Sequence, residues 1–380
     1  MGKPKIRFEG YSEDWEQRKL GEIITEYKET VDSDCTLPIL TSSKTEGVIL
    51  QEEHFGRKQQ HDITGYNILP RNYCTYRNRS DGVDFTFNIN KCCDKGIISK
   101  FYPVFSGKNS DVFFLSLVLN NSDEVVREIA YTCTGPGQKV LSFLDLQKMK
   151  VRVPSFDEQK EIAAYFDSLD HLITLHQRKC DEIKTLKKYM LQKMFPQNGE
   201  KVPEIRFDGF TEDWEQRKLG DVAQEFRSGN SLKADEIDIT GDYPVYGGNG
   251  LRGYTSTYNH DGEYALIGRQ GALCGNMNYS VGKAYFTEHA VVVKADENND
   301  TRFLYYMLDT MNLGQYSDQS AQPGLAVNKL VKLENRFPTK EEQQRMGWYF
   351  SNIDHLITLH QRKCNELKEI KKYMLQNMFV

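Results

Sequence analysis

Two segments of this 380-residue chain occur twice in the same order, and this duplication constrains the fold more than any other feature. The first segment is IRFEGYSEDWEQRKLGEI from Ile6, which returns as IRFDGFTEDWEQRKLGDV from Ile205. The second is FDSLDHLITLHQRKCDEIKTLKKYMLQKMF from Phe166, which returns as FSNIDHLITLHQRKCNELKEIKKYMLQNMF from Phe350. The sequences between these segments differ in the two halves. The pattern predicts two equivalent units that share a framework and differ in what it carries.

The second repeated segment predicts a long helix in each half. Each helix is expected to begin at a capping box after a proline, at 155–158 and at 339–342. Apolar residues then recur at steps of three and four: Leu169, Ile173, Cys180, Ile183, Leu186, Met190 and Met194, repeated as Ile353, Ile357, Cys364, Leu367, Ile370, Met374 and Met378. A long helix with so narrow an apolar stripe needs a partner, and its own duplicate is available in the chain. We therefore expect an antiparallel intramolecular coiled coil with pseudo-twofold symmetry.

The blocks between the repeats are expected to be mixed α/β, which makes the fold class α+β. Residues 262–268 and 283–294 have strand composition. A short helix is predicted in each half, because Phe114, Leu115, Val118 and Leu119 share the spacing of Phe303, Leu304, Met307 and Leu308. The expected organisation is a variable domain at 1–153, a helical region at 154–196, a linker at 197–204, a second variable domain at 205–336 and a second helical region at 337–380.

Composition excludes several classes of protein. Apolar content of 39% with 12% aromatic residues is enough for packed cores. No apolar run approaches the ~18 residues of a membrane span, and the N-terminus does not resemble a signal peptide. Eight scattered cysteines without CxxC pairs indicate a reducing, cytoplasmic location rather than a zinc site. The net charge of −5 argues against a free-standing protein that coats nucleic acid, yet it permits a local basic surface or a role within a complex.

Catalytic motifs are missing from the sequence. Glu158-Gln-Lys160 matches the second element of a PD…(D/E)xK nuclease, but no proline is followed by aspartate, and Glu158 is better explained as a capping residue. The chain has no Pro-Pro for an amino-methyltransferase loop and no GxxxxGK[ST]. We therefore expect a non-catalytic chain without a cofactor of its own.

Each repeated helix carries two histidines, His171 with His176 and His355 with His360. A spacing of five residues places two side chains on different faces of a helix, unlike the i, i+4 pair of a helical zinc site. We expect these histidines to pack in or beside the coiled-coil seam, with no metal.

Cations, amides and aromatic residues gather in several loops of the variable blocks. Arg, Gln and Asn can bond base edges bidentately, and flanking glycines let a backbone approach a phosphate. The candidate DNA-binding residues are Ser42, Ser43, Lys44, Tyr76, Arg77, Asn78 and Arg79 in the first block, and Asn249, Arg252, Tyr254, Tyr258, Arg269, Gln270 and Asn276 in the second. The alternative is that these loops are ordinary hairpin turns, which Gly-Asn and Asn-Gly also favour.

The whole arrangement resembles the specificity subunit of Type I restriction–modification systems. The resemblance rests on the duplicated RFEGYSEDWEQRKLGEI segment and on PSFDEQKEIAAYF and PTKEEQQRMGWYF, which lead into the repeated helices. GPGQ at 135–138 and AQPGL at 321–325 are similar to the turn that closes a target recognition domain in that family. YPVYGGNGLRGY and LIGRQGALCGN in the second block look like recurrent features of such domains.

The resemblance implies a subunit that binds double-stranded DNA and neither cuts nor methylates it alone. Each of two target recognition domains would read one half of a bipartite, asymmetric site, with the coiled coil setting their spacing. Two methyltransferase subunits would dock on the helices, and restriction subunits that translocate DNA would join them. S-adenosylmethionine, ATP and magnesium would belong to those partners. The rival interpretation is a coiled-coil scaffold whose variable domains bind protein or glycan.

Overall fold

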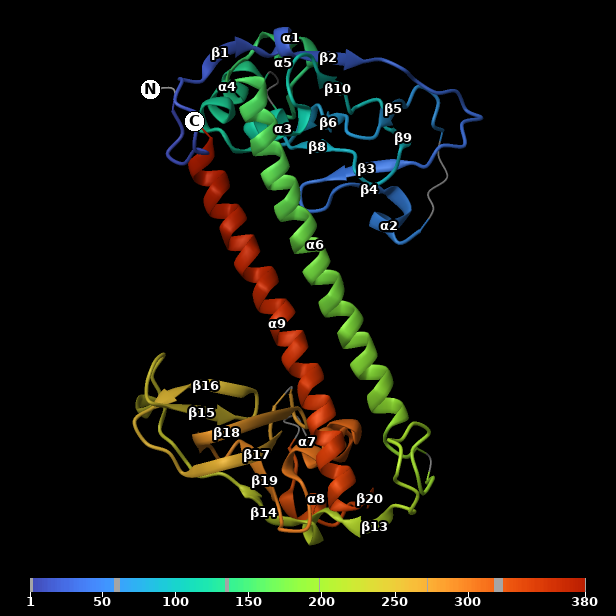
Figure 1. Cartoon of the computed structure of the whole chain (residues 1–380), viewed down its shortest axis with the longest axis vertical. Helices are drawn as coiled ribbons and strands as arrows, with labels where there is room; N and C mark the ends of the chain where they lie inside the picture. Colours follow the sequence, from blue (N-terminus) through green and yellow to red (C-terminus); the bar gives the residue numbers. More distant parts are fainter. Residues whose placement is uncertain are drawn as a thin grey trace. The chain divides into compact units, whose positions relative to one another are not determined.

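The computed structural model describes residues 3–57, 62–133, 137–197, 199–271, 273–317 and 324–379, and it divides into two compact units. The first unit comprises residues 1–175 and 363–380, and the second comprises 176–362. This division cuts both long helices, α6 (Phe156–Lys193) and α9 (Lys340–Met378), so that each unit holds one variable domain and a segment of each helix (Figure 1). The fold class is α+β, as expected from the sequence. Residues 135–136 and 321–323 of the two predicted closing turns lie outside the described residues.

The domain of the first unit is built on short antiparallel strands. Its largest sheet has the order β2-β10-β6-β8, and the pairs β1-β12, β3-β4, β5-β9 and β7-β11 surround it. The strands are β1 (Glu16–Lys19), β2 (Ile24–Tyr27), β3 (Leu40–Ser43), β4 (Gly47–Leu50), β5 (Asn67–Pro70), β6 (Cys74–Tyr76), β7 (Arg79–Ser80), β8 (Phe87–Ile89), β9 (Lys95–Ile98), β10 (Val104–Gly107), β11 (Lys139–Val140) and β12 (Lys150–Val153). The helices before α6 are α1 (Leu20–Ile23), α2 (Gln51–Phe55), α3 (Val112–Asn121), α4 (Asp123–Thr132) and α5 (Phe143–Lys148).

The domain of the second unit has one larger sheet, with the order β14-β19-β17-β18-β15-β16, beside the pair β13-β20. The strands are β13 (Glu215–Lys218), β14 (Ala223–Ser228), β15 (Tyr243–Gly247), β16 (Gly250–Thr255), β17 (His260–Gly268), β18 (Met277–Phe286), β19 (Ala290–Ala295) and β20 (Glu334–Phe337). Helices α7 (Thr301–Thr310) and α8 (Val327–Leu330) precede α9, with 3-10 turns at Leu219–Asp221, Ala234–Glu236 and Leu313–Tyr316. The predicted short helices are confirmed as α3 and α7, and the predicted strand at 262–268 as β17. The segment 283–294, predicted to have strand character throughout, comprises the end of β18, a turn at 287–289 and most of β19.

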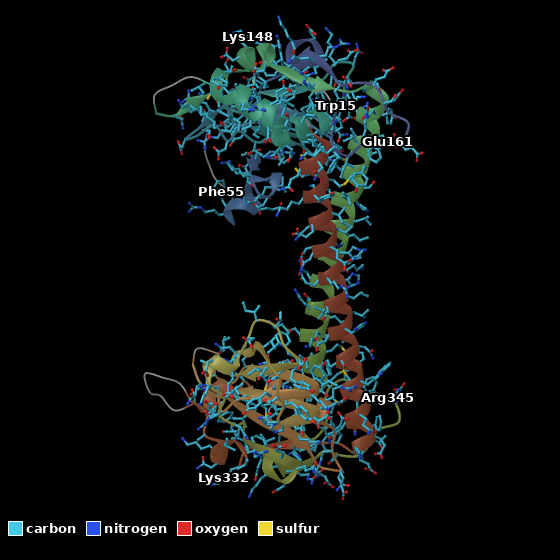
Figure 2. The ribbon with its side chains drawn as sticks, turned by 90° about the vertical axis from the view of Figure 1, so that its left-hand side faces the viewer. Trp15, Phe55, Lys148, Glu161, Lys332 and Arg345 are labelled. Atoms are coloured by element: carbon cyan, nitrogen blue, oxygen red, sulfur yellow. The ribbon has the colours of Figure 1, made fainter. Side chains whose placement is uncertain are left out.

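Each core is closed by the far end of the helix that starts in the other repeat. In the first unit the ring of Phe379, just after α9, packs against Trp15, Phe114 and Phe166 at centroid distances of 6.4, 6.1 and 5.9 Å. In the second unit Phe195, just after α6, packs in the same way against Trp214, Phe303 and Phe350. Trp15 and the nearby α6 residue Glu161 can be followed in Figure 2. The repeated tryptophan and the repeated helix end thus form one aromatic cluster in each unit.

The two long helices pair antiparallel within each unit. In the second unit Lys187 Nζ donates to Asp354 at 2.6 Å, and the Cys180 thiol contacts the Ile357 carbonyl. The first unit has the same two contacts with the helices interchanged. Lys371 of α9 pairs with Asp170 of α6, and the Cys364 thiol of α9 contacts the Ile173 carbonyl of α6. As the residue number rises on one helix it falls on the other, which is the expected antiparallel coiled coil.

Burial along the seam follows the repeat closely. The predicted seam residues Leu169, Cys180, Ile353, Cys364 and Leu367 are buried, and Ile173, Ile183, Met190, Ile357 and Met374 are partly buried against the two cores.

Two residues of the predicted apolar stripe are not in the seam. Leu186 is 47% exposed and Ile370 is 43% exposed. The adjacent Lys187 and Lys371 turn toward the partner helix instead and reach its aspartates. The stripe prediction was therefore wrong at these two positions.

The predicted capping boxes are only half formed. Ser155 Oγ accepts a hydrogen bond from the Glu158 amide at 3.4 Å, but the Glu158 carboxylate does not return to the cap. It is 1% exposed and accepts two hydrogen bonds from the Arg7 guanidinium, both at 2.7 Å. Glu342 forms the same buried fork with Arg206. The glutamate anchors the N-terminal segment of each repeat to the start of its long helix. This structural role explains Glu158 without the nuclease motif.

Candidate nucleic-acid interface

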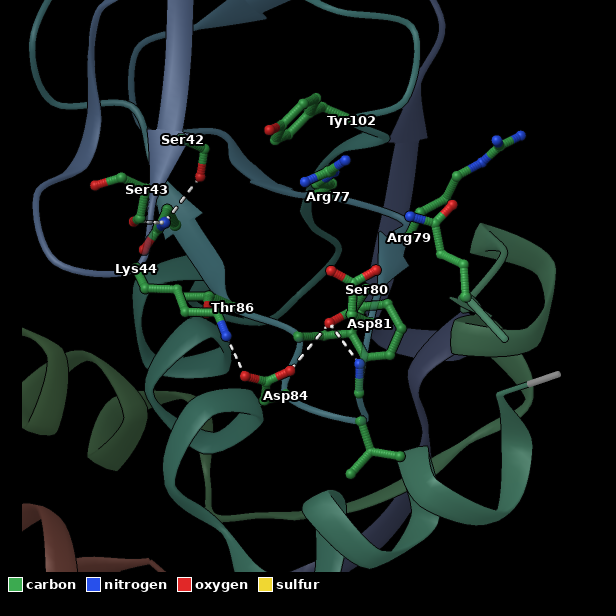
Figure 3. Close-up of a pocket in the computed structure, with 15 residues that line it drawn as sticks. Ser42, Ser43, Lys44, Arg77, Arg79, Ser80, Asp81, Asp84, Thr86 and Tyr102 are labelled. Carbon is green, nitrogen blue, oxygen red and sulfur yellow. Dashed lines mark hydrogen bonds and ion pairs between the residues drawn. The ribbon is translucent and has the colours of Figure 1, made fainter. Parts of the chain in front are cut away.

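A hollow of about 600 Å³ in the first unit collects many of the predicted DNA-binding residues (Figure 3). The β3–β4 hairpin contributes Ser42, Ser43 and Lys44, and the segment after β6 contributes Arg77 and Arg79. Further lining residues are Ser80, Asp81, Asp84, Asn88, Tyr102 and Gln138. The hairpin and β7 are far apart in the sequence, so the fold creates this hollow.

Hydrogen bonds fix the hairpin wall of the hollow. The Asn88 amide donates to Ser42 Oγ at 2.8 Å and to the Ser43 carbonyl at 2.9 Å. Ser43 Oγ accepts the Glu46 amide at 2.9 Å, which closes the turn between β3 and β4. Both hydroxyls therefore have protein partners, and they shape the wall in addition to any contact they make with a ligand.

The cations of the hollow are held in different ways. Lys44 forms an ion pair with Asp84, which also accepts a hydrogen bond from Ser80 Oγ at 3.0 Å. The Arg79 guanidinium lies 4.6 Å from the centroid of the Phe101 ring. Arg77 is exposed and makes no ion pair with any residue that the structure describes. Three cations against Asp81 and Asp84 leave the hollow with a small positive excess, suited to a polyanion.

Two residues predicted for this site make contacts within the fold. Tyr76 is fully buried, and its hydroxyl donates to the Leu141 carbonyl at 3.1 Å. Burial raises the pKa of this phenol, which stays neutral. The Asn78 backbone bridges Phe101 and Leu141, and its side-chain oxygen is buried without a partner among the described residues. The Tyr76 side chain is not available to DNA because it is fully buried, whereas Asn78 stays partly exposed.

In the second unit a glycine-rich turn brings another group of predicted residues together. Gly248, next to the exposed Asn249, lies so close to other backbone that an added Cβ would stand 3.0 Å from the His289 carbonyl oxygen. At Gly268 an added Cβ would stand 2.3 Å from the Gly248 carbonyl oxygen. These glycines permit backbone to pack on backbone, a different use from the predicted approach to phosphate. The packing sets Asn249 beside the end of β17 and the residues that follow it.

The segment after β17 presents Arg269, Gln270 and Asn276. Arg269 is partly exposed, and its guanidinium donates to the Glu288 carbonyl at 3.4 Å. The exposed Gln270 pairs its side-chain oxygen with His289 Nδ1 at 3.1 Å. Asn276 is exposed, and its carbonyl accepts the Gly268 amide at 2.8 Å. Together with Asn249 they form a compact polar edge.

The remaining predicted residues are spread over other parts of the same sheet. Arg252 is exposed on β16, while Tyr254 is partly buried and bonds the Asp238 backbone in both directions at 2.9 Å. Tyr258 precedes β17 and so lies at the strand end opposite Arg269. Its ring packs on Tyr243 at 5.0 Å and under the Lys283 ammonium at 4.6 Å. A hydrogen bond to the Tyr258 hydroxyl raises the pKa of Lys283, which remains a cation.

Sequence reasoning missed several residues of these surfaces. Asp84, Asn88 and Tyr102 line the first hollow, and His289 orients Gln270 in the second unit. None belongs to a cation-rich or glycine-rich stretch, so composition carries no signal for them. By contrast, Gln159 had a usable signal, since it is repeated as Gln343. Each glutamine joins the start of its long helix to the start of α3 or α7 through its amide.

The described residues meet neither the requirement of a three-ligand metal site nor that of a membrane-spanning helix. They contain no group of three or more His, Cys, Asp or Glu side chains arranged to hold a metal. No helix in this part of the chain is long and apolar enough to cross a membrane. His176 and His360 meet in the seam, whereas His171 and His355 are exposed on the outer faces of their helices.

Comparison with known proteins defines the class to which this architecture belongs. The family of the Type I restriction modification DNA specificity domain matches residues 12–185 and again residues 211–369. These two matches cover both variable blocks and most of both long helices. The chain therefore belongs to this family and holds two copies of its domain. This membership supports a specificity role in place of a catalytic one.

Individual relatives agree with the assignment. The Type I restriction enzyme EcoprrI specificity subunit of Escherichia coli is 45% identical over 165 residues, which cover 42% of this chain and 40% of that protein. A putative specificity subunit of Haemophilus influenzae is 29% identical over 144 residues and 37% of each chain. The match thus spans about two fifths of these two relatives. The MjaVIII specificity subunit of Methanocaldococcus jannaschii is 22% identical over 74% of this chain and 73% of that protein.

The fold has a solved counterpart. A crystal structure of the S subunit of a Type I restriction-modification system from M. genitalium superposes with a TM-score of 0.70. The superposition covers 100% of this chain and 99% of that chain at 15% identity. At that identity the likeness establishes a shared fold.

Proposed function

We propose that this chain is the DNA sequence-specificity subunit of a Type I restriction–modification complex, in which each unit reads one half of a bipartite, asymmetric site in double-stranded DNA. The observation that carries the proposal is the contrast between the two units. Their helix contacts are the same, residue for residue, while their exposed polar surfaces differ. A common frame with two different surfaces suits one complex that reads two different half-sites. The paired helices then set the spacing between those half-sites.

The helices also present a surface suited to identical partners. Beyond Phe156 at the start of α6, eight large apolar side chains on them are 40% to 59% exposed: Leu172, Leu175, Ile370 and Tyr373 in the first unit, and Leu186, Tyr189, Leu356 and Leu359 in the second. Each precedes a residue that faces the partner helix, such as Leu172 before Ile173. In an antiparallel pair, positions one step before the seam lie on one face of both helices. Each unit thus carries the same exposed apolar stripe.

We assign these two stripes to two methyltransferase subunits of the complex, one on each unit. An apolar stripe beside charged residues is typical of a protein interface. A repeated stripe predicts two copies of one partner. Restriction subunits that translocate DNA complete the assembly, and S-adenosylmethionine, ATP and magnesium act in those partners. The acidic balance of this chain fits a complex whose other subunits neutralise part of the DNA phosphate charge. Such a complex works in the cytoplasm.

An exchange of recognition domains tests the proposed function. Residues 22–152 are replaced by the corresponding block of another specificity subunit, and methylated sites are mapped across the genome. We expect one half of the methylated sequence to change and the other half to stay the same. Duplex binding by the reconstituted complex that showed no sequence selectivity would favour a scaffold role instead.

The second half-site has its own test. Replacing both Arg269 and Gln270 with alanine removes two candidate base-reading side chains from the polar edge of the second unit. We expect weaker discrimination in that half-site only, by roughly 1 to 3 kcal/mol for each side chain that bonds a base edge bidentately. Unchanged specificity would remove these residues from the interface.

The assignment of the stripes is tested separately. Leu356 and Leu359 are replaced together by glutamate. In the control protein Leu144, an exposed leucine on α5, is replaced by glutamate. We expect the double variant to bind one methyltransferase subunit fewer in native mass spectrometry, with the control unchanged. Two subunits bound to the double variant would place their docking surface elsewhere.

A further inference from the structure

The hollow of the first unit contains a carboxylate that does not fit a surface made only to attract a polyanion. Asp84 has a side chain that is 64% exposed and lies among Lys44, Arg77 and Arg79. A fixed negative charge there repels phosphate and lowers affinity for every DNA sequence. A carboxylate retained in such a place is better suited to selecting between bases than to binding the backbone.

Two protein groups hold Asp84 in place and keep it charged. Lys44 forms an ion pair with one carboxylate oxygen, and Ser80 Oγ donates to the other at 3.0 Å. The hydrogen bond from Lys44 and then that from Ser80 lower the pKa of Asp84. Ser80 is itself fixed, because its hydroxyl oxygen accepts the Gly82 amide at 3.3 Å. The side chain is therefore oriented before any ligand arrives.

The carboxylate also keeps unused acceptor capacity. Two carboxylate oxygens offer about four lone-pair positions, and Lys44, Ser80 and the backbone amide of Asp84 itself use three of them. The exposed remainder faces the hollow shown in Figure 3. Among base edges in the major groove, only the exocyclic amino groups donate hydrogen bonds, whereas guanine O6 and N7 and thymine O4 are acceptors that a carboxylate repels.

We propose that Asp84 is a specificity-determining residue that accepts a hydrogen bond from an exocyclic amino group, N4 of cytosine or N6 of adenine, in the half-site read by the first unit. This inference rests on the proposed function. Lys44 has a second task in this arrangement, because its ammonium offsets the repulsion between Asp84 and the neighbouring phosphates.

Removal of single amino groups from the DNA tests the inference. The half-site is first obtained by selecting duplexes from a randomised library with the reconstituted complex. Every base pair displays one amino group in the major groove. Each is then removed in turn, with purine in place of adenine or 2-pyrimidinone in place of cytosine. We expect one removal in the first half-site to weaken binding by about 5- to 160-fold, the range that one good base contact gives, because that amino group bonds Asp84. The analogue that weakens binding identifies the base.

Variants of the chain assign the contact to this residue. With Asp84→Ala the same DNA change should have no effect, and binding to unrelated duplex should rise because a negative charge is removed. Asp94→Ala is the matched control, since Asp94 is an exposed aspartate paired with Arg71 outside the hollow. It should keep the full discrimination. Lys44→Ala should weaken binding to all sequences and reduce the slope of log affinity against log salt by about 1.

The outcomes distinguish an error about Asp84 from an error about the function. If Asp84→Ala keeps the wild-type sensitivity to every amino-group removal, or if no removal affects the wild-type complex, the inference about Asp84 is wrong while selective binding still supports the proposed function. If the wild-type complex selects no sequence from the library, the proposed function itself fails.

Discussion

His176 and His360 face each other across the coiled coil with their Nδ1 atoms 3.0 Å apart, and they are the same residue of the repeated segment. Their rings lie 5.2 Å apart between centroids, and both side chains are partly buried. One ring must donate and the other accept, so the two copies of one residue take different roles. A residue that meets its own duplicate marks the level about which the antiparallel pairing is symmetric.

Substitution of these histidines should show strong coupling. We expect His176→Leu alone to cost about 1 kcal/mol of unfolding free energy, because it leaves the partly buried His360 nitrogen without its hydrogen bond. Replacing both histidines with leucine should cost less than the sum of the two single changes, since two leucines pack as a seam layer. Urea unfolding of the four proteins measures the coupling. His171→Leu, on the exposed side of the same helix, is the control, and simple additivity would contradict the prediction.

The fork between Arg7 and Glu158 should be one of the most sensitive contacts in the first unit. Arg7→Met leaves a carboxylate that is 1% exposed without its partner, so we expect the stability of this unit to fall by roughly 3 to 5 kcal/mol. Replacing both residues with methionine should restore most of that stability, because the buried charge is gone. Denaturant unfolding tests both variants. Arg18→Met, which breaks an exposed pair with Glu16, should cost less than about 1 kcal/mol. A double variant as unstable as Arg7→Met would count against this explanation.

The paired long helices could be predicted from the sequence because the segment that forms them occurs twice. Duplication identified the helices and their partners, and the shared spacing identified α3 and α7. What failed was the assignment of single faces. Leu186 fits a step of three after Ile183. Lys187 nevertheless faces the partner helix, because its ammonium donates a hydrogen bond to Asp354 there. One residue is a rotation of about 100° on a helix, so periodicity alone does not decide between neighbours.

The candidate site was less predictable for a different reason. Tyr76 and Arg77 are adjacent in the sequence, and only the fold shows that one packs on Phe87 while the other enters the hollow. Likewise Glu158 fits a capping box by spacing, but its partner Arg7 lies 151 positions away. The residues around Glu158 therefore do not reveal that a distant arginine, and not the local cap, binds its carboxylate.

One aspartate, Asp309 at the end of α7, predicts how the stability of the second unit changes with pH. Asp309 keeps an exposed surface, but partial desolvation by the surrounding protein raises its pKa, with Lys187 opposing the shift and Asp354 adding to it. A carboxyl group whose pKa is raised by folding favours the folded state below its ordinary pKa, and this contribution disappears as the pH rises through the raised value. Asp309→Asn should therefore be more stable than the wild-type protein at pH 7, and the difference should shrink toward about pH 4. Thermal unfolding at both values measures it. An advantage of Asp309→Asn that grew on acidification would contradict the sign.

The spacing of the two half-sites should follow the length of the paired helices. Because the helices are antiparallel, lengthening α6 alone would carry Lys187 away from Asp354 and break the seam. We expect that insertion to destabilise the protein and abolish selective binding. Seven residues inserted after Gln177 and seven more after its duplicate Gln361 keep the apolar stripe in phase and lengthen both helices by about 10 Å. At about 3.4 Å for each base pair, methylated sites should then contain a spacer longer by about three base pairs, with both half-sites unchanged. Genome-wide mapping of methylated bases reads the spacer directly. A folded double-insertion protein that keeps the original spacer would show that the helices do not set it.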